Sequence, residues 1–350
     1  MGWWQVSADT LARSRFVVSP LAETFASLKL LHSGVATHPG ERVWLDAHRP
    51  CHLRMLADDP VTALLVRAGL GRNWIADFLT PTPRDGETFE EGVARVRAVP
   101  PDAARAHLRL SLEGPLPAAL DRDDLAERAA ALLEHVWERS VLPYWDRRRR
   151  ILEADIVART ALVSRGGWAT VLDALRPGTR WLGGSRFQVN LHAYPPREIS
   201  GAELVFVPVT PKSGWVSWED PGQGASGAGV PEEPARYAVV YACSGVLADC
   251  AGGRAVPASA SLDALLGEAR ARVLVLLGSP LSTSHLVAVT GQGLGSVGRH
   301  LRVLLEAGLV ERHRAGRSVL YSRSAAGEVL VEAAVCTGDG GEGPGGRSRG

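Results

Sequence analysis

The stretch GLGSVGRHLRVLLEAGLV, residues 293–310, decides how this chain is interpreted. Its apolar residues Val297, Leu301 and Leu304 recur at three- and four-residue spacing, which predicts a helix with one buried face. Gly308 follows the last of them and suits the left-handed conformation of a helix C-cap. We therefore expect an amphipathic helix that ends just before Gly308.

Upstream of this helix the pattern predicts two further helices. Ser261 can cap a helix whose apolar residues line one side until Gly278, and Ser282 can cap a shorter helix over residues 283–289. Residues 290–292, Thr-Gly-Gln, form a tight turn between the short helix and the one that follows. The spacing is that of a helix-turn-helix.

Downstream, two short runs with strand character follow, at residues 310–314 and 318–323. Residues 315–317, Ala-Gly-Arg, join them with the composition of a hairpin turn. Helix, helix, turn, helix and hairpin within about 60 residues is the order of a winged helix-turn-helix. We expect this domain over residues 261–328.

Positive charge is concentrated in the same segment. The whole chain carries a net charge of only +1, but residues 299–323 contain six arginines and two glutamates. A basic stripe on one element is typical of nucleic-acid binding, whereas the overall charge says nothing of it. The sequence therefore predicts that this segment contacts duplex DNA.

With the apolar side buried, the opposite side of the helix presents residues that can meet a major groove. We expect Arg299 to pair with guanine or phosphate, and Arg302, at the flank, to contact phosphate. Arginines around the hairpin glycine suit contact with the DNA backbone or the minor groove. The candidate DNA-binding residues are Ser296, Arg299, His300, Arg302, Val303, Arg312, Arg314, Arg317 and Ser318.

Residues 296–310 resemble the recognition helix and strand entry of ArsR-type transcriptional regulators, and residues 314–321 resemble the wing of that family. A second resemblance, to actinobacterial regulators with a long N-terminal domain of unsettled role, rests on residues 19–21 and 143–147. The family implies a homodimer that binds a palindromic operator, often as a repressor released by an effector. The effector would be an unidentified small molecule.

Metal-sensing members of that family carry paired cysteines in the helix before the recognition helix, but residues 283–289 contain none. His48, Cys51 and His52 form the one compact ligand-like cluster, and such single-turn groupings without a second pair are usually structural. We expect no metal, no cofactor and free thiols at all four cysteines.

Residues 293–298 also match the dinucleotide-binding pattern G-x-G-x-x-G, which makes an NAD(P)-binding oxidoreductase the main alternative. A doubly wound sheet needs further strands and helices after this motif. Only about 50 residues follow it, so we favour the DNA-binding interpretation.

The first 260 residues are expected to form an α+β domain for dimerisation and possible effector sensing. Helical patterns at 20–34 and 123–174, the latter with breaks at Pro143 and at 166–167, precede short β-rich runs between residues 180 and 242 that predict one small sheet. The sequence contains no P-loop, G-x-S-x-G or H-E-x-x-H motif, so we expect no enzyme and no catalytic residues.

Three smaller expectations concern the rest of the chain. The arginine run 147–150 is expected to be a solvated helix face, and the tryptophans near the β-rich part are expected to pack in the core rather than line an effector pocket. The Gly-rich tail, residues 329–350, is expected to be disordered. Without a membrane span or signal peptide in the sequence, we expect a cytoplasmic, nucleoid-associated protein.

Overall fold

The computed structural model describes residues 2–37, 39–191, 195–220, 234–243, 260–278, 280–315 and 318–336. The chain divides into two compact units, one of residues 1–243 with 251–253 and one of residues 244–250 with 254–350. The sequence predicted a boundary after residue 260, and residues 244–259 before it lie outside the described residues. Both units contain helices and strands, so the α+β class is confirmed.

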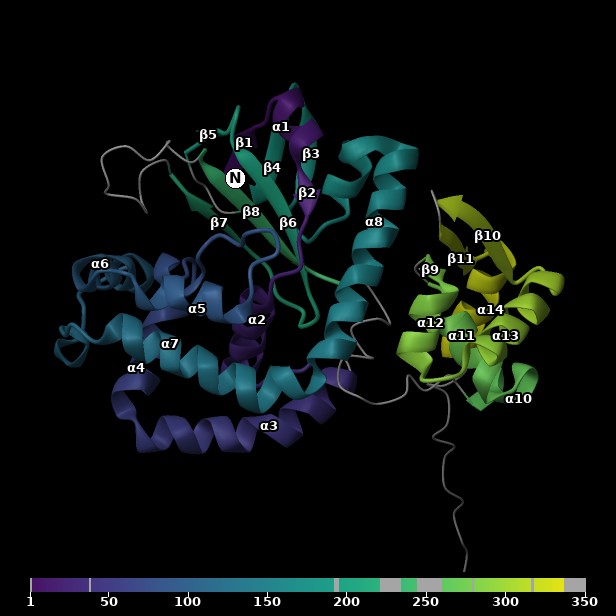
Figure 1. The fold of residues 1–350 in the computed structure, drawn as a ribbon, viewed down its shortest axis with the longest axis horizontal. Helices are drawn as coiled ribbons and strands as arrows, with labels where there is room; N and C mark the ends of the chain where they lie inside the picture. Colours follow the sequence, from purple (N-terminus) through teal and green to yellow (C-terminus); the bar gives the residue numbers. More distant parts are fainter. Residues whose placement is uncertain are drawn as a thin grey trace, which may run out of the picture. The chain divides into compact units, whose positions relative to one another are not determined.

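The first unit has a helical part and a β-rich part (Figure 1). Its helices are α1 (Ala8–Arg13), α2 (Pro20–Ser33), α3 (Pro39–Asp58), α4 (Pro60–Gly69), α5 (Phe89–Arg97), α6 (Pro101–Leu112), α7 (Leu125–Val136) and α8 (Trp145–Asp173). Its strands are β1 (Gly2–Gln5), β2 (Arg15–Phe16), β3 (Arg180–Gly183), β4 (Arg186–Asn190), β5 (Arg197–Glu198), β6 (Glu203–Val209), β7 (Trp215–Glu219) and β8 (Arg236–Ala242).

These strands form two sheets, whereas the sequence predicted one. One sheet has the order β3-β4-β1-β5 and the other has the order β2-β6-β8-β7. The N-terminal strands β1 and β2 each enter a different sheet, and β6 pairs with β8 in parallel. The sequence analysis missed β1, β2 and β5 because two to four residues carry too little periodicity to indicate a strand.

The parallel strands β6 and β8 are covered on both faces. On one face Val205, Val207 and Val240 belong to the core that the helices α2 to α7 build. On the other face Phe206 and Tyr241 pack in a core shared with β1, β4 and the end of α8. Burial on both faces is the usual environment of parallel strands, and it explains why both read as nearly continuous apolar runs.

The predicted helix over residues 20–34 is confirmed, and both of its ends are capped. The hydroxyl of Ser19 accepts a hydrogen bond from the Ala22 amide, Pro20 opens α2, and Gly34 ends it with a φ of 65°. The breaks predicted in the long helical region also occur. A turn of 3-10 helix, Leu142–Tyr144, contains Pro143, and Gly167 has a non-helical φ of 70° inside α8.

One arginine of the run 147–150 does not lie on a solvated face. Arg148 is buried, and its guanidinium donates to the carboxylate of Glu23 at 2.8 Å and to Ser27 at 2.8 Å. Glu23 is completely buried and also accepts hydrogen bonds from the amide and hydroxyl of Thr210, just after β6. This ion pair joins α2, α8 and the end of β6.

The tryptophans near the sheets pack as expected. Trp215 is buried with its ring edge against Phe25, at 5.2 Å between centroids, and Trp168 stacks on Phe16 at 5.9 Å. Trp181 and Trp218 lie partly buried against the same core as Phe206. No helix in the described ranges combines the length and apolar composition that crossing a bilayer requires.

The second unit consists of short helices around a small sheet. Its elements are α10 (Ala260–Leu266), α11 (Glu268–Leu276), β9 (Leu281–Ser282), α12 (Thr283–Thr290), α13 (Leu294–Glu306), β10 (Val310–Ala315), β11 (Ser318–Arg323) and α14 (Ala325–Cys336). The sheet has the order β10-β11-β9.

Two expectations for this unit are corrected. The single helix predicted from Ser261 to Gly278 is broken in two at Gly267, which has a φ of 77°. Residues 329–336, predicted within the disordered tail, are part of helix α14. The rest of the predicted tail, residues 337–350, lies outside the described residues.

Glu23→Gln is expected to lower the free energy of unfolding of the first unit by about 3–5 kcal/mol, because Arg148 would stay buried without its counter-charge. All ten tryptophans belong to this unit, so tryptophan fluorescence during urea unfolding reports on it alone.

Glu153→Gln is the matched control, since Glu153 pairs with Arg149 at the surface, where both side chains are about half exposed. A surface pair contributes about 0–1 kcal/mol. Equal losses from the two substitutions would contradict the role given to the buried pair.

Candidate nucleic-acid interface

Helix α13 separates apolar from basic side chains. Val297, Leu301 and Leu304 are at most 1% exposed and face the interior of the second unit, as predicted. Arg299 and Arg302 are exposed on the other side, and Val303 is 37% exposed. Within the described residues, neither arginine makes an ion pair or hydrogen bond with another side chain. Among the described residues, no neighbouring side chain therefore neutralises the charges on this face.

The centre of the exposed side differs from the expectation. Ser296 and His300, which the sequence placed on the outward face, are half-buried, and their side chains share a hydrogen bond of 3.2 Å. Arg302, expected at the flank, is exposed with Arg299. The helical period shows which residues face outward, but the width of the covered side depends on the neighbouring elements.

Arg270, at the start of α11, is a basic residue that the sequence analysis did not include. Burial chiefly, and then the charges of Arg270 and Arg299, lowers the pKa of His300 below its usual value. His300 is therefore neutral at pH 7 and can donate one hydrogen bond and accept one. The electrostatic effect of Arg270 on His300 places a third positive charge near this surface. The charge count over residues 299–323 does not include it, because it lies on an earlier helix.

The turns at both ends hold α13 in place. Gly291, with a φ of 71°, makes the turn after α12, and the Thr290 hydroxyl accepts from the amide of Gln292. At the other end the amides of Gly308 and Leu309 donate to the carbonyls of Leu305 and Leu304. Gly308 has a φ of 68°, so the left-handed C-cap that the sequence predicted is present, and the two hydrogen bonds make it a Schellman motif.

The predicted hairpin is formed by β10 and β11, which pair in antiparallel register from Val310 with Arg323 to Ala315 with Ser318. Arg312 is exposed on β10, while Glu311 lies 3.5 Å from His313 on the same strand. Arg317 and the side chains of Arg314 and Ser318 lie outside the described residues, so their predicted contacts stay predictions.

Arg323, which contributed to the positive charge count, has a structural position instead. Its guanidinium donates to the carbonyls of Leu274 and Val275 at the end of α11, at 3.0 and 2.9 Å, and pairs with Glu328 at 2.7 Å. It satisfies carbonyl groups that a helix C-terminus leaves without partners. Arg323 is thus not available to the exposed basic side.

The alternative dinucleotide site does not fit the geometry around residues 293–298. The fingerprint requires a strand directly before the glycines, but α12 precedes them. Gly293 caps α13, and Gly295 and Gly298 lie within the helix with nothing within 4 Å of an added Cβ. These glycines therefore do not make the strand-to-helix turn that holds a pyrophosphate.

The cluster of His48, Cys51 and His52 lies on α3 in the first unit. Among the described residues, no group of three or more histidine, cysteine or acidic side chains has an arrangement that could hold a metal ion. Cys51 and Cys243 are free thiols, the first exposed and the second buried.

Comparisons with known proteins give no match: no family model, no curated protein and no solved structure matches this chain. The resemblance of residues 296–321 to ArsR-type regulators stays a prediction.

Leu301→Ala is expected to destabilise the second unit by about 2–5 kcal/mol, because it leaves a cavity under α13. Val303→Ala, on the same helix, should change its stability by less than about 0.5 kcal/mol. The second unit has no tryptophan, so the measurement is hydrogen exchange of peptides from α11 and α13, followed by mass spectrometry. Faster exchange in Val303→Ala than in Leu301→Ala would show that the buried side of α13 is assigned incorrectly.

Proposed function

We propose that this protein is a sequence-specific DNA-binding transcriptional regulator of the ArsR type, and that it acts as a repressor. Its second unit would be a winged helix-turn-helix, with α13 as the recognition helix and the β10–β11 hairpin as the wing. The observation that carries the proposal is the division of α13 into a fully buried apolar side and an exposed side with Arg299 and Arg302.

The order of the elements supports this assignment. Helix α12, a three-residue turn and α13 precede the hairpin, and β9 adds a third strand beside β11 through Leu281 and Ser282. A major groove about 12 Å wide accepts one helix, and a hairpin that follows it can reach the adjacent backbone. The elements are thus those that a winged helix uses on duplex DNA.

The exposed side chains suit two kinds of contact. Arg299 can form two parallel hydrogen bonds with guanine, while Arg302 and Arg312 can neutralise phosphates. Neutral His300, held by Ser296, can donate to or accept from a base edge. The proposal also includes contacts with the DNA backbone by Arg314, Arg317 and Ser318. These contacts rest on the family resemblance alone.

The family resemblance also implies the assembly and the place of action. A homodimer would bring two copies of α13 to successive major grooves, so that the operator is a palindrome. We propose that the first unit supplies dimerisation contacts and that the protein acts on chromosomal DNA in the cytoplasm.

The first test is selection of DNA from a random duplex pool by the purified full-length protein. We expect enrichment of a palindrome whose half-sites lie about 10 base pairs apart, one helical turn. Enrichment of an asymmetric site would contradict the dimer, and no enrichment would contradict sequence-specific binding. Thermal stabilisation by NAD⁺ in place of DNA would favour the oxidoreductase alternative.

The second test measures the affinity of variants for the selected duplex. Arg299→Ala is expected to cost about 1–3 kcal/mol and to relax base preference, because it removes a base contact. Arg302→Ala should weaken binding to all sequences alike. The logarithm of affinity should fall with the logarithm of salt concentration with a slope of roughly −4 to −8 for a dimer, about −0.9 for each phosphate.

Arg165→Ala is the charge-matched control, because Arg165 is an exposed arginine on α8 in the first unit. It should leave affinity and salt slope unchanged. If Arg299→Ala and Arg302→Ala also bind like the parent protein, α13 is not the DNA-binding surface.

A further inference from the structure

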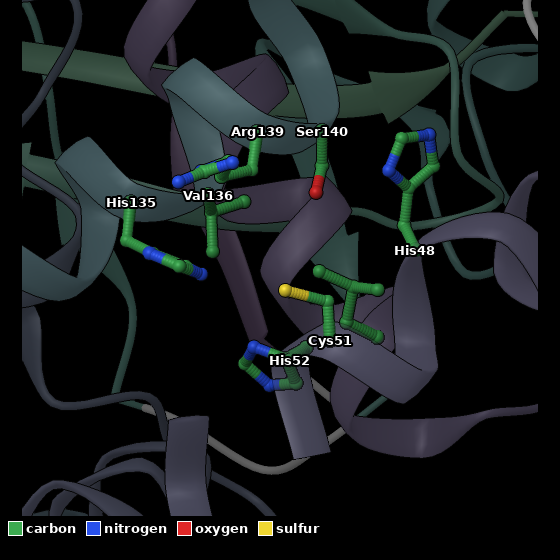
Figure 2. A pocket seen from close by; sticks show the side chains of 8 residues that line it. His48, Cys51, His52, His135, Val136, Arg139 and Ser140 are labelled. Carbon is green, nitrogen blue, oxygen red and sulfur yellow. The ribbon is translucent and has the colours of Figure 1, made fainter. Parts of the chain in front are cut away.

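The first unit contains a cavity of about 200 Å³ that the proposed DNA contacts do not use. It lies where α3 passes α2, the end of α7 and the π-helical turn Trp137–Val141. Figure 2 shows side chains from these elements turned toward one space. The residues that line it are Leu31, His48, Cys51, His52, His135, Val136, Arg139 and Ser140.

His52 indicates that this cavity takes a polar ligand. His52 is buried, with only 2% of its surface exposed. Neither of its ring nitrogens has a hydrogen-bond partner in the described structure. An imidazole left in this state costs free energy that a ligand hydrogen bond would recover. In Figure 2 its ring lies below the thiol of Cys51 and faces the side of the cavity where His135 lies.

The charges around the cavity favour an anion. Its lining includes three imidazoles and the guanidinium of Arg139 and contains no carboxylate. Burial, followed by the positive fields of His135, His32 and Arg49, lowers the pKa of His52 to about 4. Arg139 also lowers the pKa of His135, after burial. These imidazoles are therefore uncharged at pH 7 and act as hydrogen-bond donors or acceptors, while the guanidinium of Arg139 supplies the positive charge that an anion would neutralise.

The size and the apolar lining restrict the ligand further. Leu31 and Val136 add apolar side chains to the polar groups of the lining. A dry cavity of about 150 Å³ is large enough for benzene, so about 200 Å³ accommodates a ring with one small polar group. An inorganic ion would leave these apolar side chains without contacts.

We propose that this cavity binds a small organic monocarboxylate with a compact apolar body, of the size of benzoate. Arg139, which is exposed at the rim, pairs with the carboxylate, and the N–H of His52 donates to it. Leu31 and Val136 pack against the apolar body. The inference does not depend on DNA binding, although such a ligand is a suitable effector for a regulator.

The test is titration of benzoate into the full-length protein by isothermal calorimetry, with benzamide as a neutral ligand of the same shape. We expect benzoate to bind about tenfold or more tightly than benzamide, since the paired charge is lost in the amide. Equal affinities would overturn the anion assignment. If inorganic phosphate binds and benzoate does not, the proposed contacts with the apolar body of the ligand are overturned.

Arg139→Gln should weaken benzoate binding about tenfold or more. Arg139 is exposed, so the substitution removes no buried contact on which folding depends. Arg54→Gln is the matched control on the exposed side of α3 and should bind as the parent does. In nitrogen-resolved NMR of the histidine side chains, benzoate should shift the His52 resonances. Binding that persists in Arg139→Gln and leaves His52 unshifted would place the ligand elsewhere and overturn the proposal.

Zn²⁺ alone serves as the competing probe, because imidazole and thiolate groups are its usual protein ligands. We expect it to leave the His52 resonances unchanged. If Zn²⁺ binds, prevents benzoate from binding and no longer binds to His52→Gln, the cavity is a metal site and the carboxylate proposal is overturned.

Discussion

A charged group that leaves water must find its partners inside the protein, and both units depend on this constraint. In the first unit Glu23 is completely buried, and its partners Arg148 and Thr210 come from segments more than 120 residues away. In the second unit the guanidinium of Arg323 donates hydrogen bonds to two carbonyls of α11 and to the carboxylate of Glu328. In each case one side chain ties together elements that are distant in the sequence.

The apolar cores supply most of the burial, but they do not select these partners. Burial of apolar area is non-directional, so a valine of β6 can pack against many neighbours. A buried carboxylate accepts only donors that meet it at hydrogen-bond distance. The ion pair of Glu23 and Arg148 therefore fixes how α2, α8 and β6 meet, while the surrounding residues make that meeting favourable.

The same physical distinction separates the two surfaces of functional interest. Arg299 and Arg302 remain in water and keep their charges available, which suits a partner that arrives with many phosphates. His52 has lost water without gaining a partner, which suits a ligand small enough to enter a cavity. One surface is exposed and cationic and the other is a small cavity, so they suit different classes of ligand.

The sequence by itself determined the features that depend on neighbouring residues. The Ser19 and Gly308 caps, the breaks at Pro143 and Gly167 and the buried side of α13 follow from local backbone and side-chain preferences. Only the tertiary structure decided which of several residues of the same kind lie in the core. Arg148 and Arg149 are adjacent and identical in kind, yet one pairs with Glu23 in the core and the other with Glu153 at the surface. The reason is that burial depends on partners from distant segments, and no local pattern records where those segments will lie.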